Sequence, residues 1–140
     1  MVTYRELAKG DKKKLVEIFQ QPSALFDFSQ FDEDALIADA NCNCVVIEKD
    51  GEVAGFATLV TYRVPTKGII GRIEDVIVDE KYRGQGIGRG VMEELIRMAK
   101  EKNIFLIELT SKPQRTAARK LYESLGFEVY DTGVFRLKLK

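Results

Sequence analysis

The sequence predicts a mixed α/β fold in which one sheet of about six to seven strands packs against about four helices. Three observations support this prediction. β-rich segments alternate with segments of helical spacing along the chain. An Asp-Gly pair at residues 50–51 separates two β-rich runs, which is a strong hairpin signal. The length of 140 residues suits a single domain, which we expect to span residues 1–140.

The first half of the chain supplies strands at residues 2–7, 44–49 and 53–64, which are rich in β-branched and aromatic residues. Between the first two of these, Asp11 is placed to cap a helix that runs through Gln20. A second, short helix is expected at residues 32–39.

The second half begins with a strand at residues 72–78, RIEDVIV, followed by the clearest helix of the chain at residues 87–102. Residues 104–109 form a short apolar strand, and residues 115–125 form an amphipathic helix that ends at Gly126 in a left-handed C-cap. Residues 127–130 and 134–139 are expected to close the sheet as a pair of strands.

The composition excludes several kinds of chemistry. The chain has no histidine, so catalysis by a Ser-His-Asp or Cys-His group is impossible. Its two cysteines, Cys42 and Cys44, are too close for an ordinary disulfide and too few for a structural zinc site, so no metal is expected. Lysine plus arginine and aspartate plus glutamate both number 22, and this zero net charge disfavours a nucleic-acid partner.

The chain shows no signal peptide and no apolar run of membrane-spanning length. We therefore expect a soluble protein without a membrane partner. Reduced cysteines suit a cytoplasmic location.

A glycine-rich segment, RGQGIG at residues 83–88, lies between the strongest strand and the strongest helix. Glycines there let backbone amides approach a ligand, and the helix start adds unpaired N–H donors. The segment lacks the Gly-Lys-Ser/Thr ending of a P-loop and the third glycine of a dinucleotide fingerprint. It therefore suits a pyrophosphate, although a flexible glycine-rich turn would look the same.

The chain resembles the GNAT family of N-acetyltransferases in two features. Arg83, Gly86 and Gly88 match the family's cofactor motif at the start of a helix. Further along, Ala118, Tyr122 and Gly126-Phe127 match a later helix of the family within AARKLYESLGF. The two features together cover roughly the C-terminal half. Many members of the family carry Asn where this chain has Arg115, which puts the usual contact of that side chain in doubt.

This resemblance implies a largely antiparallel mixed sheet that is splayed at its centre, with acetyl-CoA as cosubstrate in the gap between the strands at residues 72–78 and 104–109. Acetyl transfer would be direct, without an acetyl-enzyme. The residues expected to bind the cosubstrate are Val76, Ile77, Val78, Arg83, Gly84, Gln85, Gly86, Ile87, Gly88, Arg89 and Arg115.

Glu74 and Tyr122 are the candidate catalytic residues. Strand alternation predicts that Glu74 shares a face with Val76 and Val78, where apolar neighbours would raise its pKa toward that of a general base. A surface carboxylate paired with Arg72 is the alternative. The resemblance implies that Tyr122 stabilises the departing thiolate, and the alternative is an aromatic side chain that packs on the core.

The predicted function is acetyl transfer from acetyl-CoA to a primary amine of a small molecule, by a homodimer. The Ile-Glu-Asp-Val stretch at residues 73–76 is similar to amino-sugar-phosphate acetyltransferases, which makes such a sugar the leading acceptor. A non-catalytic acetyl-CoA-binding regulatory module and an enzyme that acts on a protein amine remain open. Phe26, Phe28 and Phe31 could form a substrate wall or simply add to the core.

Overall fold

The computed structural model describes residues 1–140, which divide into two compact units, residues 1–109 and residues 110–140. None of the helices is both long enough and apolar enough to span a membrane. One domain over residues 1–140 stays a prediction.

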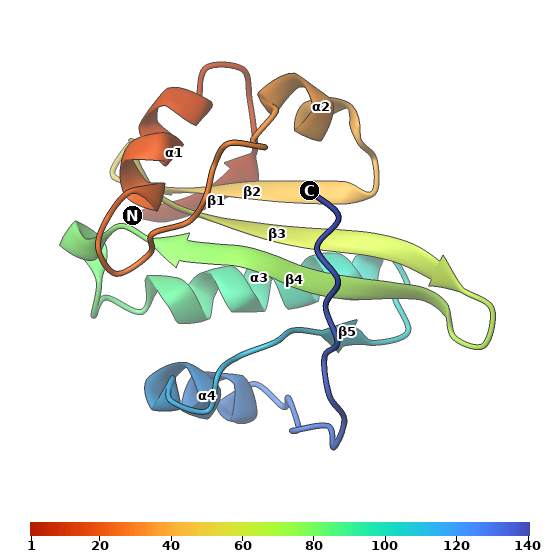
Figure 1. The fold of residues 1–140 in the computed structure, drawn as a ribbon. Coiled ribbons are helices and arrows are strands. Elements are labelled where there is room, and N and C mark those ends of the chain that lie inside the picture. The colour runs from red at the N-terminus through yellow and green to blue at the C-terminus, as the bar shows by residue number, and fades with distance from the viewer. The chain divides into compact units, whose positions relative to one another are not determined.

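The first unit contains a five-stranded sheet in the order β1-β2-β3-β4-β5 (Figure 1). All neighbouring strands are antiparallel except β4 and β5, which are parallel. The mixed, largely antiparallel sheet is confirmed, with fewer strands than predicted. The strands are β1 (Val2–Glu6), β2 (Cys42–Lys49), β3 (Glu52–Val64), β4 (Gly68–Val78) and β5 (Ile107–Glu108).

Helices cover both faces of this sheet (Figure 1). α1 (Lys12–Phe19) and α2 (Glu33–Ala38) lie on one face, and α3 (Ile87–Glu101) lies on the other. The apolar side of α1 packs in a core with Phe56 and Ile77 of the sheet. The apolar side of α3 is equally buried, because its inward residues recur at the helical period: Ile87, Val91, Met92, Leu95 and Ala99.

The hairpin between β2 and β3 forms as predicted. Asp50 and Gly51 have φ angles of 50° and 85°, which are the left-handed conformations that a tight hairpin turn of this kind requires.

The start of α1 is capped differently from the prediction. Asp11 stands at the N-cap position, but its side chain makes no capping bond to the helix. It instead binds Arg5 and accepts a hydrogen bond from the Ala8 amide at 2.8 Å. The carboxylate of Glu33, at the start of α2, accepts the Lys12 amide at 2.8 Å and so ties the two helices together.

A β-bulge interrupts β4 in its second half. Thr58 of β3 opposes Glu74 and Phe56 opposes Ile77, so the single residue between them on β3 faces both Asp75 and Val76. Asp75 has a φ of 51°. The extra residue shifts the alternation, and Glu74 shares its face with Ile77 rather than with Val76 and Val78. The predicted common face of those three residues is therefore wrong.

β4 and β5 pair only at Gly71 with Ile107 and at Arg72 with Glu108. Beyond Arg72, residues 73–78 of β4 have no strand on the side away from β3. The sheet is therefore splayed between β4 and β5. β5 is shorter than predicted, because only two of the six residues in the apolar run 104–109 reach a ladder position.

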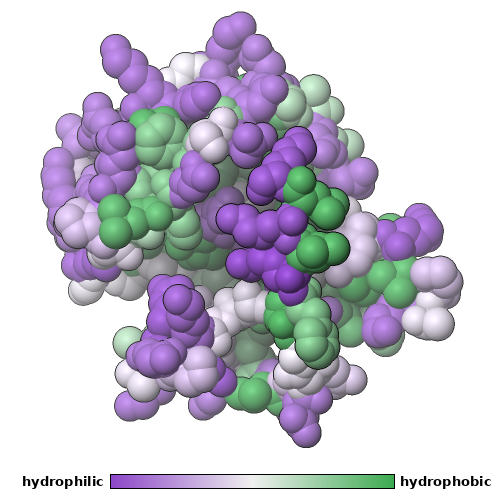
Figure 2. Space-filling view, in the orientation of Figure 1, coloured by the Kyte–Doolittle hydropathy of each residue, from purple (hydrophilic) through white to green (hydrophobic).

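The second unit contains one regular element, α4 (Thr116–Ser124). Gly126, with a φ of 98°, follows it in the predicted left-handed position, and the Phe127 amide returns to the Tyr122 carbonyl at 3.0 Å. The strands predicted at residues 127–130 and 134–139 are absent. Alternation alone does not make a strand, and these residues have no ladder partner. Figure 2 shows hydrophobic and hydrophilic side chains alternating along the exposed C-terminal segment.

Candidate acyl-donor and acceptor site

The glycine-rich loop joins β4 to α3 through a short 3-10 turn at Glu80–Tyr82. Gly84 and Gly86 have φ angles of 77° and 76°, which only glycine adopts readily. No hydrogen bond within the protein uses the backbone amides from Gly84 through Gly88, and the first bond of α3 runs from Gly90 to the Gly86 carbonyl. Left-handed residues that alternate in this way turn successive N–H groups toward one concavity, which is an anion-binding geometry.

The space in front of these glycines is open. A Cβ atom built on Gly84, Gly86 or Gly88 meets no protein atom within 4 Å. The loop amides therefore have room for a ligand at close range. Arg83 is tethered to the Val78 carbonyl by contacts of 3.4 Å, and Arg89 forms an ion pair with Glu93 at 3.3 Å. Both arginines add positive charge beside the amides.

Two side chains outside the motif fix the start of this loop. Gln21 donates to the buried carboxylate of Asp79 at 2.9 Å and accepts the Glu80 amide at 3.0 Å. The Ser23 hydroxyl donates to Glu80 at 2.6 Å. Gln21 and Ser23 were not predicted as site residues, because nothing in a polar segment some sixty residues upstream indicates a contact with the loop.

The splayed part of β4 leads directly into this loop. It includes Val76, Ile77 and Val78, the residues expected to pair with the cosubstrate through their backbones. The Ile77 side chain is buried in the core and is 4% exposed, so only its backbone is available to a ligand. The missing β5 partner leaves backbone groups unpaired along this edge, where an extended ligand can bind.

Two carboxylates stand side by side where the bulge begins. Glu74 accepts a hydrogen bond from the Arg72 guanidinium at 2.6 Å, and the two side chains are 45% and 33% exposed. Asp75 makes no hydrogen bond or ion pair, and the residue is exposed. Desolvation by the surrounding protein, and secondarily the Glu74 charge, raise the pKa of Asp75 above its ordinary value.

The two cysteines lie on the same face of the sheet as Glu74. Cys44 opposes Thr58 on β3, and Thr58 opposes Glu74 on β4. The Cys42 and Cys44 sulfurs are 3.8 Å apart, within hydrogen-bond distance of each other, and form no disulfide. Burial raises the pKa of Cys42 and raises that of Cys44 to about 12, so both remain neutral thiols near pH 7.

The aromatic residues between α1 and α2 are part of the core. Phe19 contacts Phe26 and Phe31 with ring centroids 5.8 and 5.7 Å apart, and Phe31 contacts Phe56 at 6.0 Å. Phe28 packs against the same cluster. All three predicted wall residues remain partly exposed, so their packing leaves a substrate contact possible.

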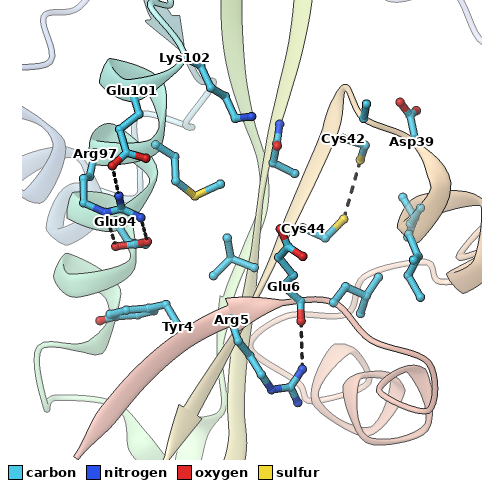
Figure 3. Close-up of a pocket in the computed structure, with 17 residues that line it drawn as sticks. Tyr4, Arg5, Glu6, Asp39, Cys42, Cys44, Glu94, Arg97, Glu101 and Lys102 are labelled. Carbon is cyan, nitrogen blue, oxygen red and sulfur yellow. Dashed lines mark hydrogen bonds and ion pairs between the residues drawn. The ribbon is translucent and has the colours of Figure 1, made fainter.

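A groove of about 590 Å³ opens elsewhere in the first unit, between β1, the start of β2, the end of α2 and the second half of α3 (Figure 3). Arg97 lies between Glu94 and Glu101, and this pairing holds the pKa of Glu94 below its ordinary value. No residue of the glycine-rich loop lines the groove. No group of three or more potential metal ligands occurs in the structure.

Tyr122 and Arg115 belong to the second unit. Tyr122, on α4, is half-buried, and its ring meets that of Phe127 in an edge contact with centroids 6.0 Å apart. Its hydroxyl makes no hydrogen bond within the protein. Arg115 stands at the N-cap position of α4 and makes no capping bond with its side chain.

Comparison with known proteins decides the family. Residues 12–127 match the acetyltransferase (GNAT) family. The chain belongs to this family. A glucosamine 6-phosphate N-acetyltransferase of Trypanosoma brucei brucei is 32% identical over 83 residues, which are 58% of this chain. The match spans only 54% of that enzyme, so the chain corresponds to about half the length of this curated relative.

Solved structures share the fold over nearly the whole chain. A transcriptional regulator from Bacillus halodurans shares 27% identity and a TM-score of 0.87, with 99% of this chain and 100% of that one covered. An acetyltransferase from Clostridium acetobutylicum, solved with acetyl-CoA, shares 23% identity and a TM-score of 0.76, with coverage of 99% and 97%. The second likeness shows the fold alone.

Proposed function

We propose that this GNAT protein transfers the acetyl group of acetyl-CoA directly to a primary amine of a small molecule. The observation that carries the proposal is the open loop of amides from Gly84 to Gly88, placed where the unpaired edge of β4 meets the start of α3. A pyrophosphate suits these amides, because they supply several N–H donors and the helix adds a partial positive charge. The backbone of Val76 to Val78 suits the extended pantetheine.

Bound acetyl-CoA supplies a thioester as the acyl donor, and the residues of this chain supply orientation and proton transfer. The neutral state of both thiols supports direct transfer, because an acetylated cysteine would require a thiolate. A carboxylate at the β4 bulge, for which the sequence predicts Glu74, would accept the amine proton. Tyr122 would donate a hydrogen bond to the sulfur as the C–S bond breaks.

An amino-sugar phosphate is the leading acceptor. The support is the Ile-Glu-Asp-Val stretch at residues 73–76 and the glucosamine 6-phosphate acetyltransferase among the relatives. Arg72 adds a cation near the two carboxylates. A regulatory acetyl-CoA-binding module is the second candidate. It is favoured by the similar structure from Bacillus halodurans, which is named a transcriptional regulator. An enzyme acting on a protein amine is the third.

The test is the release of CoA thiol from acetyl-CoA in the presence of an amine panel. The panel contains glucosamine 6-phosphate, unphosphorylated glucosamine, amino acids, polyamines, an aminoglycoside and a peptide with a free N-terminus. Turnover with a small-molecule amine is expected, fastest with the sugar phosphate. Acetyl-CoA binding without thiol release from any amine would establish the regulatory module instead. Turnover only with the peptide would point to a protein substrate.

A homodimer in the cytoplasm remains the predicted assembly and location. Light scattering coupled to size-exclusion chromatography tests the dimer directly. A mass equal to that of one 15.9 kDa chain would contradict it.

A further inference from the structure

The chain enters the glycine-rich loop through a turn that a buried carboxylate caps. Asp79 follows the last residue of β4, and its side chain accepts the Lys81 amide at 3.0 Å at the start of the 3-10 turn. The residue is only 7% exposed. A carboxylate buried to this extent needs further hydrogen-bond donors, because an unpaired charge away from water is costly. The group that supplies the second donor therefore fixes the turn from which the loop departs.

That second donor is the side-chain amide of Gln21, which lies 58 residues upstream of Asp79. The Gln21 nitrogen donates to the Asp79 carboxylate at 2.9 Å, and the Gln21 oxygen accepts the Glu80 amide at 3.0 Å. One side chain thus uses a donor and an acceptor on two consecutive residues of the turn. Two such bonds fix the orientation of the turn as well as its position.

The backbone of Gln21 is anchored to the end of α1. Its amide donates to the Ile18 carbonyl at 3.2 Å, and its carbonyl accepts the Ala24 and Leu25 amides at 2.9 and 3.0 Å. Ile18 and Phe19 are 1% and 4% exposed, so this end of α1 belongs to the core. In Figure 1 the segment that follows α1 reaches the end of β4. Gln21 therefore joins the turn to a rigid part of the fold.

The other side chains that attach the turn act at the surface. Ser23 donates to the Glu80 carboxylate through its amide at 3.1 Å and its hydroxyl at 2.6 Å. Tyr82 donates to Glu52 at 2.9 Å. These bonds are exposed, and water can replace them when they break, whereas a buried carboxylate that loses its donor stays unsatisfied. The attachment of the turn therefore depends mainly on Gln21.

The loop itself has little other support. The backbone amides from Gly84 to Gly88 make no hydrogen bond within the protein, and Arg83 adds only contacts of 3.4 Å to the Val78 carbonyl. A loop of this kind takes its position from the turn that precedes it. A ligand binds more tightly when the amides are already in place, because less conformational freedom is lost on binding.

We propose that Gln21 is a positioning residue for the cosubstrate. Its side-chain amide holds the turn ahead of the loop and thereby sets the affinity of the loop for acetyl-CoA. This inference rests on the proposed function, which gives acetyl-CoA to the loop as its ligand. Gln21 takes no part in the chemical step, so its loss weakens the binding of acetyl-CoA and leaves kcat and the KM of the amine largely unchanged.

The test is isothermal titration calorimetry of acetyl-CoA with the parent chain and with Gln21→Met. Methionine keeps an unbranched side chain of similar length and removes both hydrogen bonds. We expect the dissociation constant of acetyl-CoA to rise about tenfold, which corresponds to about 1.4 kcal/mol. On the best amine of the thiol-release panel, the KM of acetyl-CoA should rise in parallel, while kcat at saturation should stay the same.

Asn43→Leu is the matched control. This change also removes a side-chain amide that bonds across the fold, from Asn43 to the Leu59 carbonyl at 3.0 Å. Asn43 lies on β2, which β3 separates from β4 and the loop. Both variants should lower Tm, but only Gln21→Met should weaken the binding of acetyl-CoA. A lower Tm in both variants with the affinity of the parent in both would make Gln21 a purely structural residue and overturn the assignment.

A reversal of the hydrogen bond gives a second, independent readout. Gln21→Glu places two carboxylates together and should weaken acetyl-CoA binding more than Gln21→Met does at neutral pH. Adding Asp79→Asn gives the pair a donor again, because the new amide can donate to the new carboxylate. The double variant should therefore bind acetyl-CoA more tightly than Gln21→Glu alone. Strictly additive effects of the two changes on affinity would contradict the proposed contact.

The outcomes separate this inference from the proposed function. An active parent whose affinity for acetyl-CoA is unchanged in Gln21→Met would overturn the role of Gln21 and leave acetyl transfer intact. A parent that binds acetyl-CoA but acetylates no amine would remove the proposed enzyme, and calorimetry would still decide the role of Gln21, because it measures binding without turnover. A parent that does not bind acetyl-CoA would overturn both.

Discussion

The glycines between β4 and α3 are required for two different reasons, the backbone conformation of the loop and the open space in front of its amides. Gly84 and Gly86 have left-handed φ angles, so any other residue strains the backbone even before a ligand binds. Gly88 has an ordinary φ, and a side chain there would meet only open space in the protein alone. Gly88 is therefore the position at which ligand contact can be separated from folding.

We expect Gly88→Val to weaken acetyl-CoA binding at least about tenfold, which corresponds to about 1.4 kcal/mol. The added branched side chain would occupy the space in front of the amides, while the free energy of unfolding should change by no more than about 0.5 kcal/mol. Isothermal titration calorimetry measures the first quantity and urea unfolding the second. Gly133→Val is the matched control, because its Cβ also meets nothing within 4 Å. Equal acetyl-CoA affinity in both variants would show the loop to be an ordinary turn.

Tyr122→Phe is expected to lower kcat by roughly 10- to 1,000-fold, or about 1.4–4 kcal/mol. The ring contact with Phe127 survives this change, and the hydroxyl has no partner within the protein to lose. An interaction that forms only as the thiolate departs lowers kcat without weakening binding of acetyl-CoA. Steady-state kinetics and a parallel Tm measurement test this. An intact kcat with altered stability would make Tyr122 a packing residue.

Asp75 also predicts a pH dependence of stability. Its pKa is raised in the folded state, so the folded protein binds more protons than the unfolded chain between the two pKa values. Stability therefore falls as pH rises through that window, and the penalty persists at neutral pH. We expect Asp75→Asn to raise Tm relative to the parent at pH 7. The difference should vanish well below the unfolded pKa of about 3.9. A difference that is constant with pH would contradict the shift.

At the scale of elements, α3 is held close to β1 through Gly90. A Cβ atom at this position would collide with the Tyr4 hydroxyl oxygen and lie 3.3 Å from the adjacent ring carbon. Burial, and secondarily Glu93 and Glu94, raise the pKa of the Tyr4 hydroxyl, which places it against the same helix. Gly90 thus sets the distance between the helix that begins at the loop and the edge of the sheet.

Gly90→Ala should destabilise the fold by about 1–3 kcal/mol, because the clash outweighs the usual gain of about 0.5–1 kcal/mol for alanine in a helix. Tyr4→Phe removes the colliding atom and should recover part of that loss in the double variant. Urea unfolding of the two single variants and the double variant gives the coupling energy. Strictly additive effects would show that Gly90 and Tyr4 do not meet.

The regular elements were largely predictable, because hydrophobic periodicity and turn residues are local signals. The clear helix at Ile87–Glu101 and the turn at Asp50-Gly51 follow from such signals. The β4 bulge was not predictable. The left-handed residue of such a bulge is often a glycine, which can be recognised in a sequence. Here the left-handed position is occupied by Asp75. One inserted residue moved Glu74 to the face opposite Val76.

Pairing partners were the least predictable feature of the whole molecule. The run at residues 104–109 and the alternating C-terminal segment have the composition of strands, yet a strand exists only where a neighbour supplies the ladder. The same principle explains the site. Gln21 and Ser23 hold the loop through contacts across the fold, which no local pattern of residues encodes.

For the molecule as a whole, selective stabilisation by acetyl-CoA is the expected sign of its function. A ligand at 100 times its dissociation constant adds about 2.7 kcal/mol to the free energy of unfolding, provided that it binds only the folded state. In the proposed site the loop amides would accept any pyrophosphate, whereas the unpaired edge of β4 would pair with pantetheine better than with a second nucleoside. Thermal unfolding with acetyl-CoA, ATP and NAD at equal concentrations should therefore show the largest Tm rise with acetyl-CoA. The rise should be clearly smaller in Gly88→Val, because a tenfold loss of affinity removes about 1.4 kcal/mol of this stabilisation, and it should persist in Gly133→Val. Equal shifts with all three ligands would reduce the site to a general phosphate-binding loop and remove the support that it gives to acetyl transfer.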